Sequence, residues 1–85
     1  MKSFKYTIKT EVGVHVKPAG QLSAAAGKYM SKIFITKGDA SADATKLLAV
    51  MSLKLVKGDK ITINVIGEDE EHAVEGIKTF IKENF

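Results

Sequence analysis

The fold is decided by residues 61–81, which read ITINVIGEDEEHAVEGIKTFI. Apolar residues first alternate with polar ones at Ile61, Ile63 and Val65, which is the two-residue repeat of a strand with one buried face. Beyond the following turn, the apolar repeat becomes helical. Its members are Ala73, Val74, Ile77, Phe80 and Ile81. This stretch therefore predicts a strand followed by a helix that packs on its apolar face, with Asp69 as the expected N-cap.

The N-terminal part of the chain predicts a strand and a helix in the same way. Residues 4–8 alternate aromatic or aliphatic side chains with lysine and threonine, which favours a half-buried strand. An alanine-rich stretch over residues 17–29 predicts a helix, because Pro18 fits a first helical turn, where its missing N–H has no partner to lose. The expected buried stripe of this helix is Leu22, Ala25, Ala26 and Tyr29.

The middle of the chain predicts a hairpin and a short helix. Residues 33–35 form an apolar run, and a Gly-Asp turn separates it from a weaker strand over residues 40–44. Residues 47–52 predict a short helix that Thr45 or a neighbour can cap. The order β-α-β-β-α-β-α indicates an α+β fold in which one sheet carries the helices on a single face.

The bulk composition is that of a small soluble protein. With 85 residues, we expect a single domain over residues 1–85 and no large internal cavity for a cofactor. The absence of cysteine excludes a disulfide framework and a thiolate metal site. No signal-peptide pattern and no membrane-length apolar stretch occurs, so we expect a cytoplasmic protein without membrane insertion.

The formal net charge is +3, and every basic residue other than histidine is a lysine, since the chain contains no arginine. The lysines are scattered and form no block of like charge, so a nucleic-acid-binding arm is not expected. A scattered lysine surface is usually just a solvated face. It can still help to attract an acidic protein partner.

Of the two histidines, only His15 is placed for chemistry. His72 lies in the charged first turn of the last predicted helix and is expected to be a solvated surface residue. His15 follows a loop containing Gly13 and directly precedes the helix marked by Pro18, where free backbone N–H groups and the helix dipole favour anions. A neutral imidazole nitrogen there can attack a phosphoryl donor, and Lys17 can help to hold the phosphoryl oxygens without a metal. The spacing alone is weak evidence for this chemistry, because a histidine near a helix start is commonly just a capping or surface residue.

A family resemblance raises the weight of the phosphoryl hypothesis. Residues 13–19, GVHVKPA, resemble the active-site signature of the HPr family, in which a glycine and an aliphatic residue precede His-Ala-Arg-Pro-Ala. The likeness continues in register through residues 47–53, 57–58, 61–63 and 67–70. HPr proteins are the histidine-containing phosphocarriers of the bacterial sugar phosphotransferase system. The resemblance implies an open-faced β-sandwich, with a four-stranded antiparallel sheet and three helices on one face.

The resemblance also implies a carrier and not an enzyme, with no cofactor and no metal. His15 would accept a phosphoryl group on Nδ1 from phosphorylated enzyme I and pass it to the A domain of a sugar-specific enzyme II. Lys17 and the helix start at Pro18 would bind the phosphate. Partners would dock on an apolar patch formed by Val16, Gly20, Leu47, Leu48 and Met51. A monomer is expected.

The sequence departs from the family pattern at three positions. Lys17 stands where the family has arginine, so a mobile point charge replaces a planar fork. Lys46 occupies the position of the serine that a dedicated kinase phosphorylates in Gram-positive relatives, and Thr45 is displaced from that position. We therefore expect no serine-type regulatory phosphorylation there. Gly20 replaces a more usual alanine and is expected to loosen the first helix slightly.

Two alternatives stay open. An HPr-like regulatory paralogue would bind a transcription factor or a metabolic enzyme without serving sugar uptake; Lys17 supports it, and the presence of His15 opposes it, because such paralogues often lack the histidine. A small RNA-binding domain of the split β-α-β type would need exposed aromatic residues on its strands. Only Phe4, Tyr6 and Phe34 are available there, and no arginine is present to read bases. A free-standing enzyme lacks a second catalytic group near His15.

Overall fold

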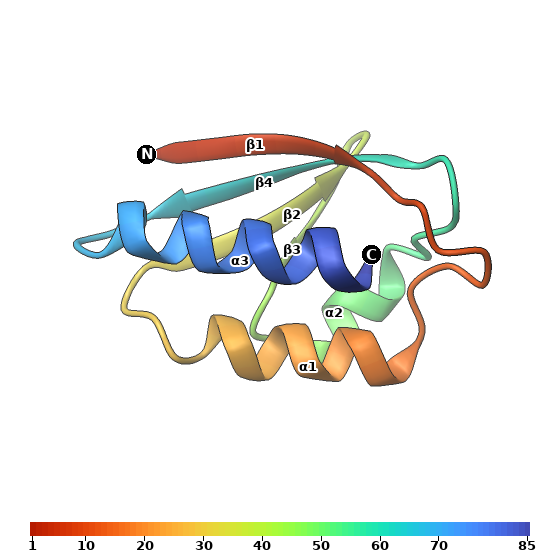
Figure 1. The fold of residues 1–85 in the computed structure, drawn as a ribbon, viewed down its shortest axis with the longest axis horizontal. Helices are drawn as coiled ribbons and strands as arrows, with labels where there is room; N and C mark the ends of the chain where they lie inside the picture. The colour runs from red at the N-terminus through yellow and green to blue at the C-terminus, as the bar shows by residue number, and fades with distance from the viewer.

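The computed structural model describes all 85 residues and contains one four-stranded antiparallel sheet. Its strands are β1 (Lys2–Thr7), β2 (Lys32–Lys37), β3 (Ala40–Asp43) and β4 (Lys60–Ile66). The strand order is β1-β4-β2-β3, so β4 lies between β1 and β2 while β1 and β3 form the two edges (Figure 1). The register pairs Phe4 of β1 with Ile63 of β4, and Ile63 in turn with Ile35 of β2.

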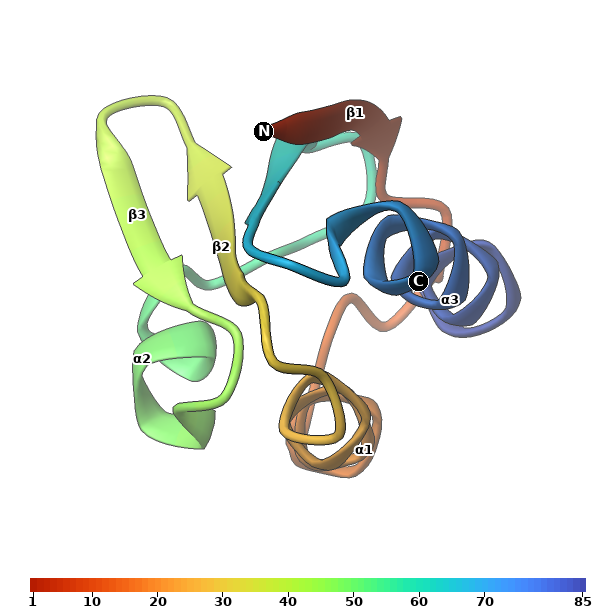
Figure 2. The ribbon, with the colours of Figure 1, turned by 90° about the vertical axis from the view of Figure 1, so that its left-hand side faces the viewer.

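Three helices cover one face of this sheet. They are α1 (Val16–Ala26), α2 (Leu47–Ser52) and α3 (Glu70–Asn84). Figure 2 shows the sheet curving along one side of the molecule with all three helices on its inner side, so the other face is open. The structure confirms the predicted element order and the open-faced architecture. No helix has the length and apolar character needed to cross a membrane.

The hydrophobic core fills the space between the sheet and the helices. The alternation along β4 directs Ile61, Ile63 and Val65 inward, and each is at most 1% exposed. The neighbouring Thr62 and Asn64 are half-buried on the open face. The other strands and the helices add further fully buried side chains, among them Ile33, Ile35, Leu22, Ile77 and Ile81. Small residues on the helices, Ala19, Ala26 and Ala73, are also fully buried and allow close packing.

Helix α1 ends earlier than the sequence predicts. The helix stops at Ala26, and Tyr29 packs against the core from the loop that follows. Beyond Ala26 the backbone tightens, since Lys28 N–H donates to the Ala25 carbonyl at 3.2 Å and Tyr29 N–H donates to the Ala26 carbonyl at 3.3 Å. These are three-residue hydrogen bonds, which commonly close a helix. Ala25 is only half-buried, so the predicted buried stripe is correct for Leu22 and Ala26.

The carboxylate of Asp69 joins two distant turns. It accepts hydrogen bonds from the backbone N–H groups of Met30 and Ser31, both at 2.9 Å, and from the Ser31 hydroxyl. Asp69 is the N-cap of α3, as predicted, but its side chain forms no capping bond. Gly67 allows the close approach: its φ is +155°, and a Cβ there would lie 2.6 Å from the Ser31 Cα. The Asp69 carboxylate therefore fixes the α1–β2 loop against the start of α3.

We predict that Asp69 makes folding stability depend on acid pH. The hydroxyl of Ser31 and then the backbone N–H of Met30 lower the pKa of Asp69 in the folded state. Its contribution is therefore complete above the unfolded pKa of about 3.9 and is lost as pH falls through the lower folded value. Asp69→Asn is expected to lower Tm at pH 7, and the difference from wild type should shrink below about pH 4.

Thermal unfolding followed by circular dichroism from neutral to acid pH measures this effect. Asp39→Asn is the matched control, because Asp39 is exposed in the β2–β3 turn and forms no ion pair. If the difference in Tm between wild type and Asp69→Asn stays constant across the whole pH range, the charged carboxylate is not the source of the stabilisation.

Candidate functional site

Backbone hydrogen bonds hold the loop that leads to His15. The N–H of Val14 donates to the carbonyl of Leu55 at 2.9 Å, and the N–H of Gly13 donates to the carbonyl of Thr10 at 3.1 Å. Gly13 has a φ of +71°, and a Cβ at this position would lie 2.7 Å from the Leu55 oxygen. Both the backbone angle and the contact therefore require glycine. The sequence marked Gly13 only as a loop breaker and did not reveal this contact.

The beginning of the same loop is tied to two other parts of the fold. The N–H groups of Lys9 and Thr10 both donate to the carbonyl of Phe85, at 2.7 and 3.2 Å. Phe85 is 2% exposed and meets the ring of Phe80 edge-on. Ile8 exchanges backbone hydrogen bonds with the turn before β4. His15 therefore follows a loop whose backbone is anchored on both sides.

His15 is the N-cap residue of α1 (the start of α1 follows the loop after β1 in Figure 1). Its backbone is extended, and its carbonyl accepts the Ala19 N–H at 3.0 Å. The imidazole forms no capping hydrogen bond and is exposed. The first turn contains no acidic residue, so the positive end of the helix dipole is not neutralised by a side chain. The ring is therefore free to react beside an anion-attracting helix end.

The first turn of α1 also supplies hydrogen-bond donors and a cation. The N–H groups of Val16 and Lys17 have no acceptor within the helix, and Pro18, the third residue of α1, has no N–H to satisfy. The ammonium group of Lys17 is exposed and takes part in none of the ion pairs of the structure. One helical turn thus combines an uncommitted imidazole, two free backbone donors and an unpaired lysine.

The residues predicted to form a docking patch lie on α1 and α2, which contact each other (Figure 2). Val16 is 61% exposed and Leu48 is 81% exposed. Leu47 and Met51 are half-buried and pack against the core, so the adjacent leucines do face different directions. Gly20 lies on α1, and the space where its Cβ would stand is empty. Of the residues predicted to form the docking patch, Val16 on α1 and Leu48 on α2 are therefore the ones with exposed apolar side chains.

Of the two options for the cap of α2, Thr45 or a neighbour, the structure excludes Thr45 and places the neighbour Lys46 at the N-cap. The N-cap is Lys46, and no side chain forms a capping hydrogen bond there. The hydroxyl and the N–H of Thr45 instead donate to the Asp43 carboxylate, at 2.7 and 2.9 Å. These two bonds, the hydroxyl first, lower the pKa of Asp43. Thr45 precedes the N-cap by one residue, and its hydroxyl is already hydrogen-bonded to the side chain of Asp43, two residues earlier in the same turn.

His72 is placed apart from this site. It is exposed in the first turn of α3, at the opposite end of the molecule from the start of α1 (Figure 1). Its ring meets the ring of Tyr29 edge-on, with 5.6 Å between centroids. The first turn of α3 also contains Glu70 and Glu71, whose charges oppose the binding of an anion. The structure thus singles out His15 as the histidine at an anion-attracting helix end.

Comparison with known proteins agrees with this geometry. The family model described as "PTS HPr component phosphorylation site" matches residues 2–83. The chain belongs to the HPr family. HPr proteins are phosphocarriers of the bacterial phosphotransferase system, and the family match spans nearly the whole chain.

Individual HPr relatives are similar over almost their full length. The phosphocarrier protein HPr of Lysinibacillus sphaericus is 36% identical over 83 residues, which are 98% of this chain and 94% of that protein. The solved histidine-containing phosphocarrier protein of Mycoplasma has a TM-score of 0.93 at 29% identity, covering 96% of this chain and 93% of that one.

The family also contains regulatory proteins that differ in assembly. The crystal structure of Crh from Bacillus subtilis, described as a swapped dimer, is 26% identical with a TM-score of 0.78, covering 99% of this chain and 97% of that one. Because a similar protein forms a swapped dimer, the expected monomer stays a prediction for this HPr-family chain.

We predict that Gly13→Ala destabilises the protein. The substitution places a Cβ against the Leu55 carbonyl and forces alanine to adopt a positive φ, a combination expected to lower the free energy of unfolding by about 1–3 kcal/mol. Urea denaturation measures the change. Gly20→Ala is the matched control: it adds the same methyl group to a helix where nothing lies within 4 Å, and should stabilise the protein by about 0.4–1 kcal/mol. Equal urea midpoints for Gly13→Ala and wild type would contradict the assigned role of Gly13.

Proposed function

We propose that this protein carries a phosphoryl group on His15, accepting it from phosphorylated enzyme I and passing it to the A domain of an enzyme II. The observation that supports this most directly is the position of His15 as an N-cap whose exposed imidazole forms no capping bond. Membership of the HPr family supports enzyme I and an enzyme II A domain as the transfer partners. In this proposal the protein itself takes up the phosphoryl group and then passes it on, so it acts as a carrier and not as an enzyme.

The proposed chemistry needs only the first turn of α1. A neutral ring nitrogen of His15, Nδ1 by the family resemblance, forms a bond to phosphorus while the bond from phosphorus to the donor breaks. The N–H groups of Val16 and Lys17 then donate to the phosphoryl oxygens, and the Lys17 ammonium balances their negative charge. Pro18 helps to start the helix there without adding a donor. Transfer to the acceptor reverses the same bond changes.

We further propose that both transfer partners dock on the apolar surface beside His15. The exposed side chains of Val16 and Leu48 provide its contact area, and the open space at Gly20 gives a partner access to α1. Leu47 and Met51 support this surface from the core side. An apolar contact that surrounds the histidine excludes water from the transfer step, which favours transfer over hydrolysis. Residues 1–85 would act as one domain and as a monomer in the cytoplasm.

The similarity to Crh supports a second candidate, a regulatory HPr-like protein that binds a transcription factor or a metabolic enzyme. The presence of His15 in the N-cap position favours the carrier. Lys46 at the family's regulatory position weakens the regulatory candidate, because a lysine there cannot be phosphorylated as a serine would be.

The carrier function predicts a phosphohistidine on His15. Incubation with phosphoenolpyruvate and purified enzyme I should give one acid-labile phosphoryl adduct per chain, detected by intact mass spectrometry. His15→Ala should abolish the adduct, and His72→Ala, which removes the other histidine, should retain it. If a demonstrably active enzyme I leaves the wild-type protein unmodified, the regulatory candidate takes the place of the carrier.

The charge at position 17 predicts graded transfer rates. Lys17→Arg should raise the rate of transfer from enzyme I several-fold, because a planar guanidinium can bind two phosphoryl oxygens at once. Lys17→Gln should lower it by about tenfold, the effect expected when one charge-assisted hydrogen bond is lost. Quench-flow kinetics with labelled enzyme I measures both rates, and Lys28→Gln controls for the loss of a distant positive charge. Equal rates for the three variants and wild type would exclude Lys17 from phosphate binding.

A further inference from the structure

Strand β1 is an unpaired edge of the sheet. It forms hydrogen bonds only with β4, and no element lies beyond it in the strand order (Figure 1). Its six residues, Lys2–Thr7, therefore leave one row of backbone N–H and carbonyl groups unpaired within the sheet. The other edge, β3, has only four residues. An unpaired row of this length can accept a further strand from another chain.

The same edge carries four lysines without acidic partners. A shallow hollow of about 700 Å³ lies along β1, and its lining includes Lys5, Lys9, Lys60 and Lys82 but no acidic side chain. None of these four ammonium groups takes part in an ion pair of the structure. Other lysines do find carboxylates: Lys2, Lys37 and Lys57 pair with Glu71, Asp59 and Glu11. Lys2 at the start of β1 is therefore paired, whereas the four lysines that line the hollow have no carboxylate partner.

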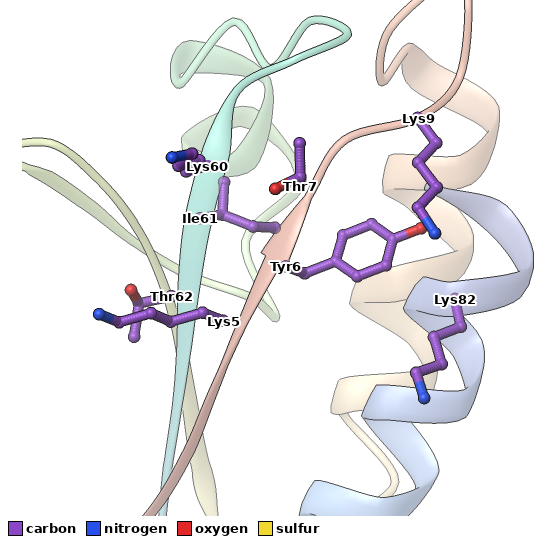
Figure 3. Close-up of a pocket in the computed structure, with 8 residues that line it drawn as sticks. All are labelled: Lys5, Tyr6, Thr7, Lys9, Lys60, Ile61, Thr62 and Lys82. Atoms are coloured by element: carbon purple, nitrogen blue, oxygen red, sulfur yellow. The ribbon is translucent and has the colours of Figure 1, made fainter.

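The four lysines lie on both sides of the strand. Figure 3 shows Lys5 and Lys60 on one side of β1, and Lys9 and Lys82 on the other, together with the ring of Tyr6. The Lys9 ammonium lies 5.7 Å from the centre of that ring. A strand added beside β1 would direct successive side chains to opposite faces of the sheet. Acidic residues at consecutive positions of such a strand would therefore meet one pair of lysines on each face.

We propose that the β1 edge binds an extended acidic segment of a partner protein as a fifth strand of the sheet. Backbone hydrogen bonds to β1 hold the segment, and its carboxylates contact the lysines on both sides. A second copy of this chain is a poor occupant, because its own β1 would bring the same lysines and repel them. In Figure 2, β1 lies across the molecule from α1 and α2, so this surface is separate from the one proposed for phosphoryl transfer.

Binding of a designed peptide tests the proposal. The probe is a fluorescein-labelled peptide of about eight residues, the length of a typical strand, with glutamates placed on both faces and valines between them. At low salt it should bind the wild-type protein saturably in fluorescence anisotropy. Amide hydrogen exchange should slow at alternate residues of β1, the sign of new backbone pairing. Lys5→Gln/Lys82→Gln should weaken binding about tenfold, since it removes one exposed charge pair on each face.

Two controls separate strand addition from attraction by charge. Lys28→Gln/Lys54→Gln removes the same charge from exposed lysines elsewhere and should change affinity by less than about twofold. A peptide of the same sequence with an N-methyl group on every amide keeps its charge but has no N–H to donate on either edge of its strand, and it should not bind. If the methylated peptide or inorganic polyphosphate binds as tightly as the probe, the edge is a general polyanion surface and the proposal is wrong. Absence of probe binding at low salt overturns it as well.

Discussion

The fold depends on the burial of one face of β4. This strand pairs on both sides, and its inward residues Ile61, Ile63 and Val65 are almost completely excluded from water. All three helices lie on the same side of the sheet as these residues, because the helices bury their own apolar stripes there. A slip of one residue in the register of β4 would turn these side chains to the open face. The alternation along β4 therefore determines the register of the sheet and the side that the helices cover.

The features that the sequence predicts well are those set by residues close together in the chain. The two-residue repeat of β4, the helical repeat of α3 and the position of Pro18 in the first turn of α1 all appear in the structure. The end of α1 was not predictable in this way, because the loop after Ala26 is held by the distant Asp69 carboxylate. At Thr45 the competing interaction is local. The hydroxyl of Thr45 donates to the carboxylate of Asp43 and therefore does not cap α2.

In the candidate site, too, local features are predictable from the sequence and contacts between distant residues are not. The N-cap position of His15 and the different exposure of Leu47 and Leu48 follow from local patterns and from the family signature. The contact that fixes the loop before His15, from Val14 to the Leu55 carbonyl, joins distant segments and needs a glycine whose role only the fold reveals. The lysines along β1 looked scattered in the sequence, because Lys5, Lys60 and Lys82 come together only when β1, β4 and α3 are assembled.

The absence of arginine fits the way this molecule presents positive charge. At the proposed phosphoryl site, the backbone N–H groups at the start of α1 have fixed directions and would orient the phosphoryl group, while Lys17 would add a mobile charge without the planar geometry of arginine. Along β1, the backbone edge would likewise set the direction of a bound strand, and flexible lysines can reach its carboxylates on either face. In both proposals the backbone provides the direction and lysine provides the charge. Because lysine is a mobile point charge, attraction at both surfaces should weaken as salt rises, while the backbone bonds that give specificity should not.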